Sequence, residues 1–247
     1  KLPFADQDIF NIVFLALIMI LGFVIFKDRF NGLLTDKGRE MLFPQAILQG
    51  NVLYKDILCI YFPLAFQLNA VGYKIFGIHL NTLLFAELFN SFLICSFIYL
   101  ISKEFTERNI SLLFAVTFGI AATFNGTLYN ILLPYSSSLM YGMTAFMAGV
   151  YCLVKYVKSE NKNFLSLAYF SGGIALACKS EYMLFFFLLV FTSFILKPCS
   201  VKENLKNLVI YTIMPAISFG ILFMQGLTFA EFMSALDFMH KFFTTDA

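Results

Sequence analysis

Long apolar runs alternate with short charged segments along the chain, in a pattern that repeats from one end to the other. The first run, Ile9–Phe26, has 18 residues and reaches about 27 Å as a helix, close to the hydrocarbon thickness of a bilayer. Six later runs cover Ile78–Ile101, Ile110–Phe124, Ser138–Val154, Phe164–Cys178, Tyr182–Leu196 and Leu208–Met224. The pattern predicts an all-α polytopic membrane protein with about seven transmembrane helices.

The composition excludes a soluble protein and gives no support for a nucleic-acid partner, a disulfide framework or a zinc site. Hydrophobic residues make up 60% of the 247 residues and charged residues 13%, whereas soluble domains average about 45–50% and about 25%. The net charge is +2, without basic clusters among aromatic residues, so a nucleic-acid partner is not expected. The five cysteines form no CxxC pair and the two histidines lie far apart, so neither a disulfide framework nor a zinc site is predicted.

The distribution of lysine and arginine predicts the orientation in the membrane. Three loops, at Lys103–Arg108, Lys155–Asn163 and Lys197–Asn207, together carry eight positive charges. The alternating segments Asn125–Tyr135 and Lys179–Glu181 carry none and one. The positive-inside rule then puts the three basic loops and the N-terminus in the cytoplasm. The segments Lys27–Gly77 and Gln225–Ala247 are expected on the outer side.

The first outer loop, Lys27–Gly77, is too long for a hairpin and too apolar for a disordered linker. From Pro63 onward, apolar residues at Leu64, Leu68, Val71 and Ile75 share one helical face, which predicts an interfacial helix. Gly38–Gln49 is a second helix candidate, interrupted by Pro44.

Two polar features fall within or beside the apolar runs. Glu87 shares a helical face with Asn90 and Ser91, and we expect it to pack inward against a polar partner rather than to act in catalysis. Lys179 and Glu181 lie between two runs of only 15 residues, which places them below the outer membrane surface. Either they serve a function inside the membrane, or they form an ion pair that caps a helical hairpin.

The first outer loop also concentrates groups that suit transfer chemistry. A carboxylate such as Asp36 can accept a proton from an attacking hydroxyl, and cations such as Arg39 or Lys55 can stabilise a phosphate leaving group. Glu40 and Asp56 accompany them. On residue types alone, a solvated surface loop is the favoured explanation of these charges.

The order of the motifs favours a catalytic role for this loop over a solvated surface loop. The loop contains Asp36-Lys37-Gly38-Arg39-Glu40, Ile47-Leu48-Gln49-Gly50, Leu53-Tyr54-Lys55-Asp56, Tyr61-Phe62-Pro63-Leu64, Gln67-Leu68-Asn69-Ala70 and Ile75-Phe76-Gly77. Further motifs follow at Leu133-Pro134-Tyr135-Ser136 and Lys179-Ser180-Glu181-Tyr182. This series resembles the polytopic C-type glycosyltransferases with the GT-C fold. The likeness is to their bacterial branch, which is related to protein O-mannosyltransferases and aminoarabinose transferases.

The resemblance implies an enzyme of the bacterial inner (plasma) membrane with its active site on the extracytoplasmic face. It would move a sugar from a polyprenyl-phosphate donor to a glycan, lipid or protein acceptor, with Asp36 as the general base. Other residues expected to contact substrate are Arg39, Glu40, Lys55, Asp56, Tyr135, Lys179 and Glu181. The aminoarabinose branch of the family carries a Glu-Lys pair before the loop proline, where this chain has Tyr61-Phe62, so neither a metal ligand nor a phosphate contact carries over from that pair. No cofactor is required, although a divalent metal is compatible with the chemistry.

The resemblance also implies that residues 1–247 form one transmembrane glycosyltransferase-like domain, the N-terminal part of a longer enzyme. Thr228–Phe243 carries an apolar stripe at Phe232, Leu236, Met239 and Phe243, which could lie on the membrane or under a later domain. The main alternative function is a multi-span transporter or a flippase for lipid-linked sugars, because Glu87, Lys179 and Glu181 could line a translocation path. A non-catalytic scaffold is a third possibility.

Overall fold

The computed structural model describes residues 4–26, 36–124, 130–132 and 134–245. In these residues the regular structure is helical, apart from one isolated bridge between Leu53 and Ile57. The α-helices are α1 (Phe4–Phe26), α2 (Asp36–Leu48), α3 (Leu64–Phe76), α4 (Leu80–Ser102), α5 (Arg108–Thr123), α6 (Ser137–Ser159), α7 (Lys162–Cys178), α8 (Met183–Phe191), α9 (Val201–Met224) and α10 (Phe229–Thr245). A short 3-10 helix, η1 (Ser180–Tyr182), precedes α8, and a π-helix, η2 (Thr192–Leu196), follows it.

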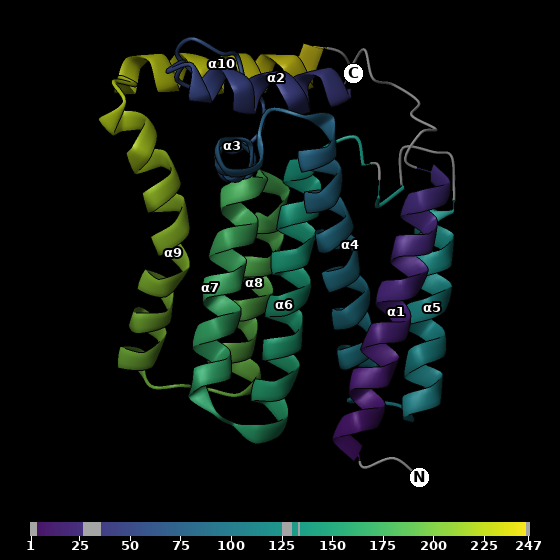
Figure 1. The fold of residues 1–247 in the computed structure, drawn as a ribbon. Coiled ribbons are helices and arrows are strands. Elements are labelled where there is room, and N and C mark those ends of the chain that lie inside the picture. The colour runs from purple at the N-terminus through teal and green to yellow at the C-terminus, as the bar shows by residue number, and fades with distance from the viewer. Residues whose placement is uncertain (1–3, 27–35, 125–129, 133, 246–247) are drawn as a thin grey trace.

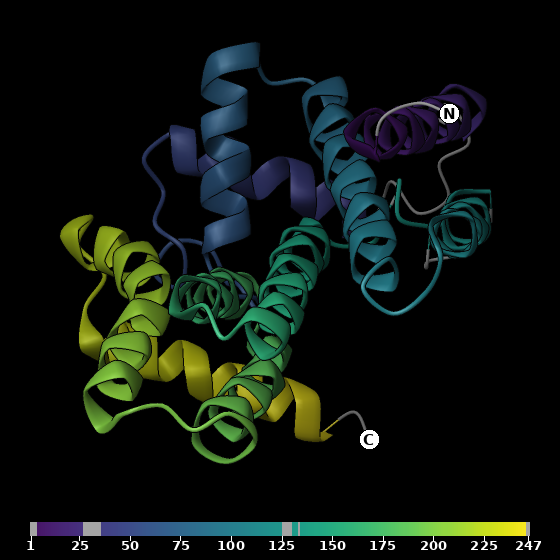
Figure 2. The ribbon, with the colours of Figure 1, turned by 90° about the horizontal axis from the view of Figure 1, so that it is seen from below.

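The helices form an upright bundle with a transverse layer across one end. Helices α1, α4, α5, α6, α7, α8 and α9 run roughly side by side, and α2, α3 and α10 lie across their upper ends (Figure 1). Seen along the bundle, α1 and α5 lie at one side and α9 at the other (Figure 2). We call the end covered by α2, α3 and α10 the loop end, and the opposite end, where the chain begins, the basic end.

Four upright helices among the described residues are long and apolar enough to cross a membrane. They are Gln7–Ile25 within α1, together with α4, α6 and α9. Their length and composition are those of an integral membrane protein, so four of the seven expected spans have the necessary length. Helices α5 and α7, with 16 and 17 residues, and the apolar segment Ser180–Leu196 are shorter.

One expected loop is largely helical. The segment Lys197–Asn207 was expected to be a loop, but α9 already begins at Val201. The Ser200 side chain accepts a hydrogen bond of 3.3 Å from the backbone N–H of Glu203, which caps the helix. Charged residues therefore occupy the first turns of α9 instead of a loop, because the cap can start the helix before the apolar run begins.

The basic end brings the three lysine-rich loops together, as their sequence pattern predicts (Figure 1). Asp8 of α1 forms ion pairs with Lys103 at 2.7 Å and with Arg108 at 3.5 Å. Glu104 pairs with Lys155 and Lys158. These contacts link α1 to the turn between α4 and α5, and that turn to the end of α6.

A close contact between backbones joins α7 to α9. A Cβ atom built on Gly173 would lie only 2.1 Å from the carbonyl oxygen of Tyr211, so only glycine fits there. Pro215, four residues after Tyr211, has no N–H to offer that carbonyl within the helix. The two helices can therefore approach at the place where α9 lacks one internal hydrogen bond.

Both helices expected in the first loop are present. The α3 helix leaves Leu68, Val71 and Ile75 of its predicted apolar face exposed, whereas Phe66 and Tyr73 on the other side are buried. The α2 helix continues through Pro44 and crosses α3 (Figure 2), with the rings of Phe43 and Phe66 5.3 Å apart. An exposed apolar face on a helix that lies across the bundle end is what an interfacial helix requires.

The C-terminal stripe packs against the first loop. Phe232 and Leu236 of α10 cover a buried cluster that the segment between α2 and α3 shares with α3, the end of α9 and α10; its buried members are Val52, Leu53, Tyr54, Cys59, Phe66, Leu222, Leu227 and Ala235. The side chains of Met239 and Phe243 lie outside the described residues. This part of the stripe therefore has a partner within the chain, which the sequence pattern did not reveal.

Candidate functional site

Two cations and two tyrosines gather at the loop end of the bundle. The guanidinium carbon of Arg39 in α2 lies 4.8 Å from the ring centroid of Tyr61, and Lys179 Nζ lies 5.5 Å from the same centroid. Lys179 Nζ also donates a hydrogen bond of 3.2 Å to the hydroxyl of Tyr135. We call Arg39, Tyr61, Tyr135 and Lys179 the cation–tyrosine cluster. It unites four segments that are far apart in the sequence.

The backbone around Tyr61 is fixed by the preceding turn. The Tyr54 hydroxyl donates a hydrogen bond of 2.6 Å to the Tyr61 carbonyl, and the Cys59 thiol donates to the same oxygen at 3.2 Å. Burial raises the pKa of Cys59 to about 12, so it stays a neutral thiol. Tyr54 itself has a left-handed backbone with φ of 69°, a conformation that costs a residue with a side chain about 1–2 kcal/mol. Tyr54 packs in the buried cluster that Phe232 and Leu236 of α10 cover, and this packing offsets that strain.

Lys179 is both recessed and charged. It is only 9% exposed, and its Nζ lies 2.8 Å from a carboxylate oxygen of Glu181, whose side chain is 62% exposed. Burial lowers the pKa of Lys179, but hydrogen bonds to Glu181 and Tyr135 outweigh it and leave the pKa above its ordinary value. The expected ion pair exists, and it faces the cluster.

Glu40 connects α2 to the start of α6. Its side chain is fully buried, with Oε1 3.3 Å from Arg39 Nη2 and Oε2 accepting the backbone N–H of Ser137 at 3.1 Å. Burial raises the pKa of Glu40, against the opposing charges of Arg39 and Lys37. A carboxylate at a helix N-terminus is favourably placed. Glu40 therefore acts as a positioning residue, because no part of it reaches the surface.

Glu87 packs inward against a polar partner, as predicted. The Ser137 hydroxyl donates a hydrogen bond of 2.6 Å to Glu87 Oε1, so Ser137 contacts both buried carboxylates. Asn90 accepts a hydrogen bond from Thr144 of α6 at 2.8 Å. The Oε2 atom of Glu87 is buried without a hydrogen-bond partner among the described residues. These contacts attach α4 to α6 near the loop end.

Two of the expected substrate contacts lie elsewhere. Lys55 Nζ donates a hydrogen bond of 3.1 Å to the carbonyl of Gly226, in the turn between α9 and α10. Asp56 accepts the backbone N–H of Val52 at 2.8 Å and so stabilises its own turn. The cluster thus includes Arg39, Tyr135 and Lys179, with Glu40 and Glu181 bound to its cations, but neither Lys55 nor Asp56.

The expected base, Asp36, is placed only by its backbone. It begins α2 and lies one helical turn before Glu40, while its side chain falls outside the described part of the chain. The part that is described holds no group of three His, Cys, Asp or Glu residues able to hold a metal ion. Tyr61 was singled out from the sequence only as a departure from the family pattern, and its contact with two cations depends on tertiary structure.

Comparisons of the chain with protein-family models, with curated proteins and with solved structures each gave no match.

Proposed function

We propose that this protein is a membrane glycosyltransferase that takes a sugar from a polyprenyl-phosphate donor and passes it to an extracytoplasmic glycan, lipid or protein acceptor. The observation that carries the proposal is the cation–tyrosine cluster at the loop end, with Arg39 and Lys179 both in contact with the ring of Tyr61. Two largely buried cations at the level where a lipid phosphate would lie provide charge-assisted hydrogen bonds to it.

The division of roles follows from the chemistry of the leaving group. A polyprenyl phosphate leaves as a stable anion, so the main demands are charge stabilisation and activation of the acceptor hydroxyl. Arg39 and Lys179 supply the first. Asp36, at the start of the same helix as Arg39, is assigned the second as general base. Tyr61 and Tyr135 hold these two cations in place through ring contacts and a hydrogen bond.

The proposal includes the topology expected from the sequence. Helices α5 and α7 and the segment Ser180–Leu196 would complete seven spans, since they lie upright beside the four long helices (Figure 1). The basic end would face the cytoplasm and the loop end the outside. Short spans would keep Lys179 beneath the outer surface, where lower polarity strengthens its contact with phosphate.

Donor binding tests the proposal without requiring an acceptor. Purified protein would be titrated with a short-chain polyprenyl phosphate and with the matching polyprenol, which lacks the charge. We expect saturable binding of the phosphate alone, weakened about tenfold or more by Arg39→Gln. Lys55→Gln, whose ammonium contacts the Gly226 carbonyl instead, is the matched control. Equal binding of phosphate and polyprenol, or of wild type and Arg39→Gln, would contradict the proposal.

A second candidate, a transporter or flippase, is favoured by Glu87. This carboxylate is 1% exposed in a membrane-spanning helix and has one oxygen without a partner among the described residues. A liposome assay separates the two functions. Movement of a lipid-linked sugar between leaflets that Glu87→Gln abolishes and Arg39→Gln leaves unchanged would favour transport.

A further inference from the structure

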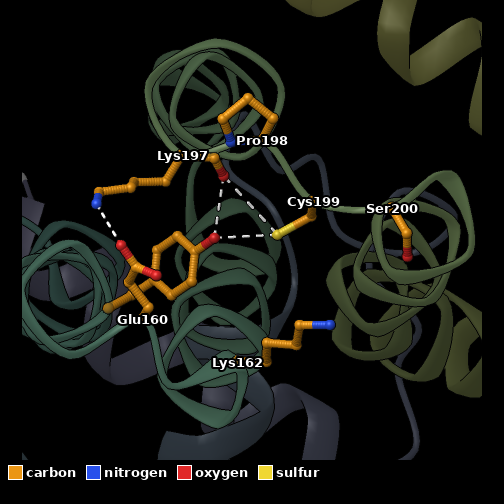
Figure 3. Close-up of a pocket in the computed structure, with 7 residues that line it drawn as sticks. Glu160, Lys162, Lys197, Pro198, Cys199 and Ser200 are labelled. Carbon is orange, nitrogen blue, oxygen red and sulfur yellow. Dashed lines mark hydrogen bonds and ion pairs between the residues drawn. The ribbon is translucent and has the colours of Figure 1, made fainter.

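A pocket opens at the basic end, opposite the cation–tyrosine cluster. It has a volume of about 340 Å³ and lies between the end of α6, the start of α7 and the segment that joins η2 to α9 (Figure 3). We call it the basic-end pocket. It is lined by Tyr156, Glu160, Lys162, Lys197, Pro198, Cys199 and Ser200.

The wall of this pocket is held by specific contacts. The buried Tyr156 hydroxyl donates to the carbonyl of Lys197 at 3.0 Å and lies 3.0 Å from Cys199 Sγ (Figure 3). The π-helix η2 ends directly before it, and Lys197 N–H donates to the carbonyl of Thr192 at 2.8 Å. Short π-helical turns are rare and occur frequently at functional sites. The pocket is therefore an ordered feature of the fold.

Its two cations are on opposite sides, and each forms an ion pair with one carboxylate. Lys197 pairs with Glu160 on one side, and Lys162 points toward α9 on the other, 3.5 Å from Glu203 (Figure 3). The side chains of Lys197 and Glu160 are 38% and 68% exposed. Exposed ion pairs contribute little to stability, so the lysines can exchange these carboxylates for another anion at little loss. The lining holds two lysines and one glutamate, and Glu203 beside Lys162 balances the remaining positive charge until an incoming anion displaces the two carboxylates.

Exposed apolar side chains lie just before and just after the pocket residues in the sequence. Ile195 and Leu196, directly before Lys197, are 66% and 54% exposed, and Val201 and Leu205, after Ser200, are 74% and 59% exposed. These residues lie at the ends of upright helices, where acyl chains surround a membrane protein. A ligand that suits both the lysines of the pocket and these apolar side chains has an anionic head group and apolar chains.

We propose that the basic-end pocket binds the phosphate of an anionic phospholipid. The ammonium groups of Lys162 and Lys197 donate hydrogen bonds to the phosphate oxygens. The acyl chains extend along Ile195, Leu196, Val201 and Leu205 toward the middle of the bilayer. Basic pockets between membrane helices are suited to anionic headgroups at this depth. The site is separate from the proposed transferase chemistry and does not depend on it.

Protection of Cys199 tests the site in the wild-type protein. The protein would be placed in nanodiscs of phosphatidylcholine, with or without phosphatidylglycerol, and treated with a thiol reagent. We expect phosphatidylglycerol to slow modification of Cys199 about fivefold or more. Cys152, on α6 and partly exposed like Cys199, is the internal control, and peptide mass spectrometry separates the two. An unchanged rate at Cys199 would overturn the proposal.

A titration by native mass spectrometry identifies the residues and the source of the phosphate. Lys162→Gln and Lys197→Gln should each weaken phosphatidylglycerol binding about fivefold. Lys241→Gln, an exposed lysine on α10 that also pairs with a carboxylate, should leave it unchanged. Undiminished binding in the double variant would refute the assignment. Equal protection of Cys199 by inorganic phosphate alone would show a free-anion site and would overturn the assignment to a lipid.

Discussion

The backbone N–H of Ser137 donates a hydrogen bond of 3.1 Å to Oε2 of Glu40, a residue 97 positions earlier in the chain. Through this contact, a carboxylate oxygen from α2 accepts the backbone N–H of the first residue of α6. Arg39, the next residue to Glu40, is thereby held near Tyr61. The position of one proposed phosphate contact thus depends on a buried carboxylate that does not reach the substrate.

Removing that acceptor should destabilise the protein. Glu40→Ala leaves the buried N–H of Ser137 unpaired, which costs about 1–3 kcal/mol, whereas Glu40→Gln keeps an acceptor oxygen of similar reach. Thermal unfolding in detergent should therefore show a lower midpoint for the alanine variant than for the glutamine variant. Equal midpoints would mean that water or another group replaces the contact.

The protonation of Glu40 should make stability depend on pH in a defined direction. Burial raises the pKa of Glu40 above 4.5 in the folded protein, so the folded state binds its proton more readily than the unfolded state. Its contribution to stability is then fully present below the unfolded pKa and is lost as the pH rises through the folded pKa. As the pH falls from above the folded pKa toward the unfolded pKa, the midpoint of wild type should rise relative to that of Glu40→Gln. A difference that does not vary with pH would contradict this.

Asp36→Asn should abolish sugar transfer and leave donor binding intact. The amide keeps the size of the side chain but cannot take a proton, and loss of a general base typically lowers the rate about 10²–10⁴-fold. The measurement compares turnover of a lipid-linked sugar with binding of polyprenyl phosphate in the same preparation. Activity within a few-fold of wild type would remove Asp36 from the mechanism.

Lys179→Met distinguishes a phosphate contact from a structural ion pair. If Lys179 contacts the donor, binding should weaken by about 1.5–3 kcal/mol, because the largely buried ammonium is lost from the cluster. Glu181→Gln, which removes the partner and keeps the cation, is the matched control and should retain binding. A lower unfolding temperature with unchanged donor affinity would instead identify a purely structural role.

Cysteine labelling in intact cells tests the orientation. Asn51 lies in the segment between α2 and α3 at the loop end, and Ser159 is the last residue of α6 at the basic end. An impermeant thiol reagent should label Asn51→Cys and not Ser159→Cys, both made in a background without the native cysteines. The reverse pattern would invert the topology and exclude an extracytoplasmic active site.

The sequence predicted most helices because their signals are local. Apolar runs and lysine-rich loops indicated the upright helices. Local pattern could not reveal that Lys55 turns toward Gly226, or that the Tyr61 ring contacts both Arg39 and Lys179, since both depend on contacts across the chain. The start of α9 was missed for a different reason: hydrophobicity marked the apolar run, while the Ser200 cap begins the helix earlier.

The contact of Gly173 with the carbonyl of Tyr211 has a mechanical consequence. Side chains that interlock between two helices can change rotamer and let one helix slide along the other, but a contact between bare backbones contains no such adjustable layer. Helices α7 and α9 are therefore pinned at one level of the bundle. Movement of the loop-end half of α9, which connects directly to α10, is restricted to tilting about this pivot.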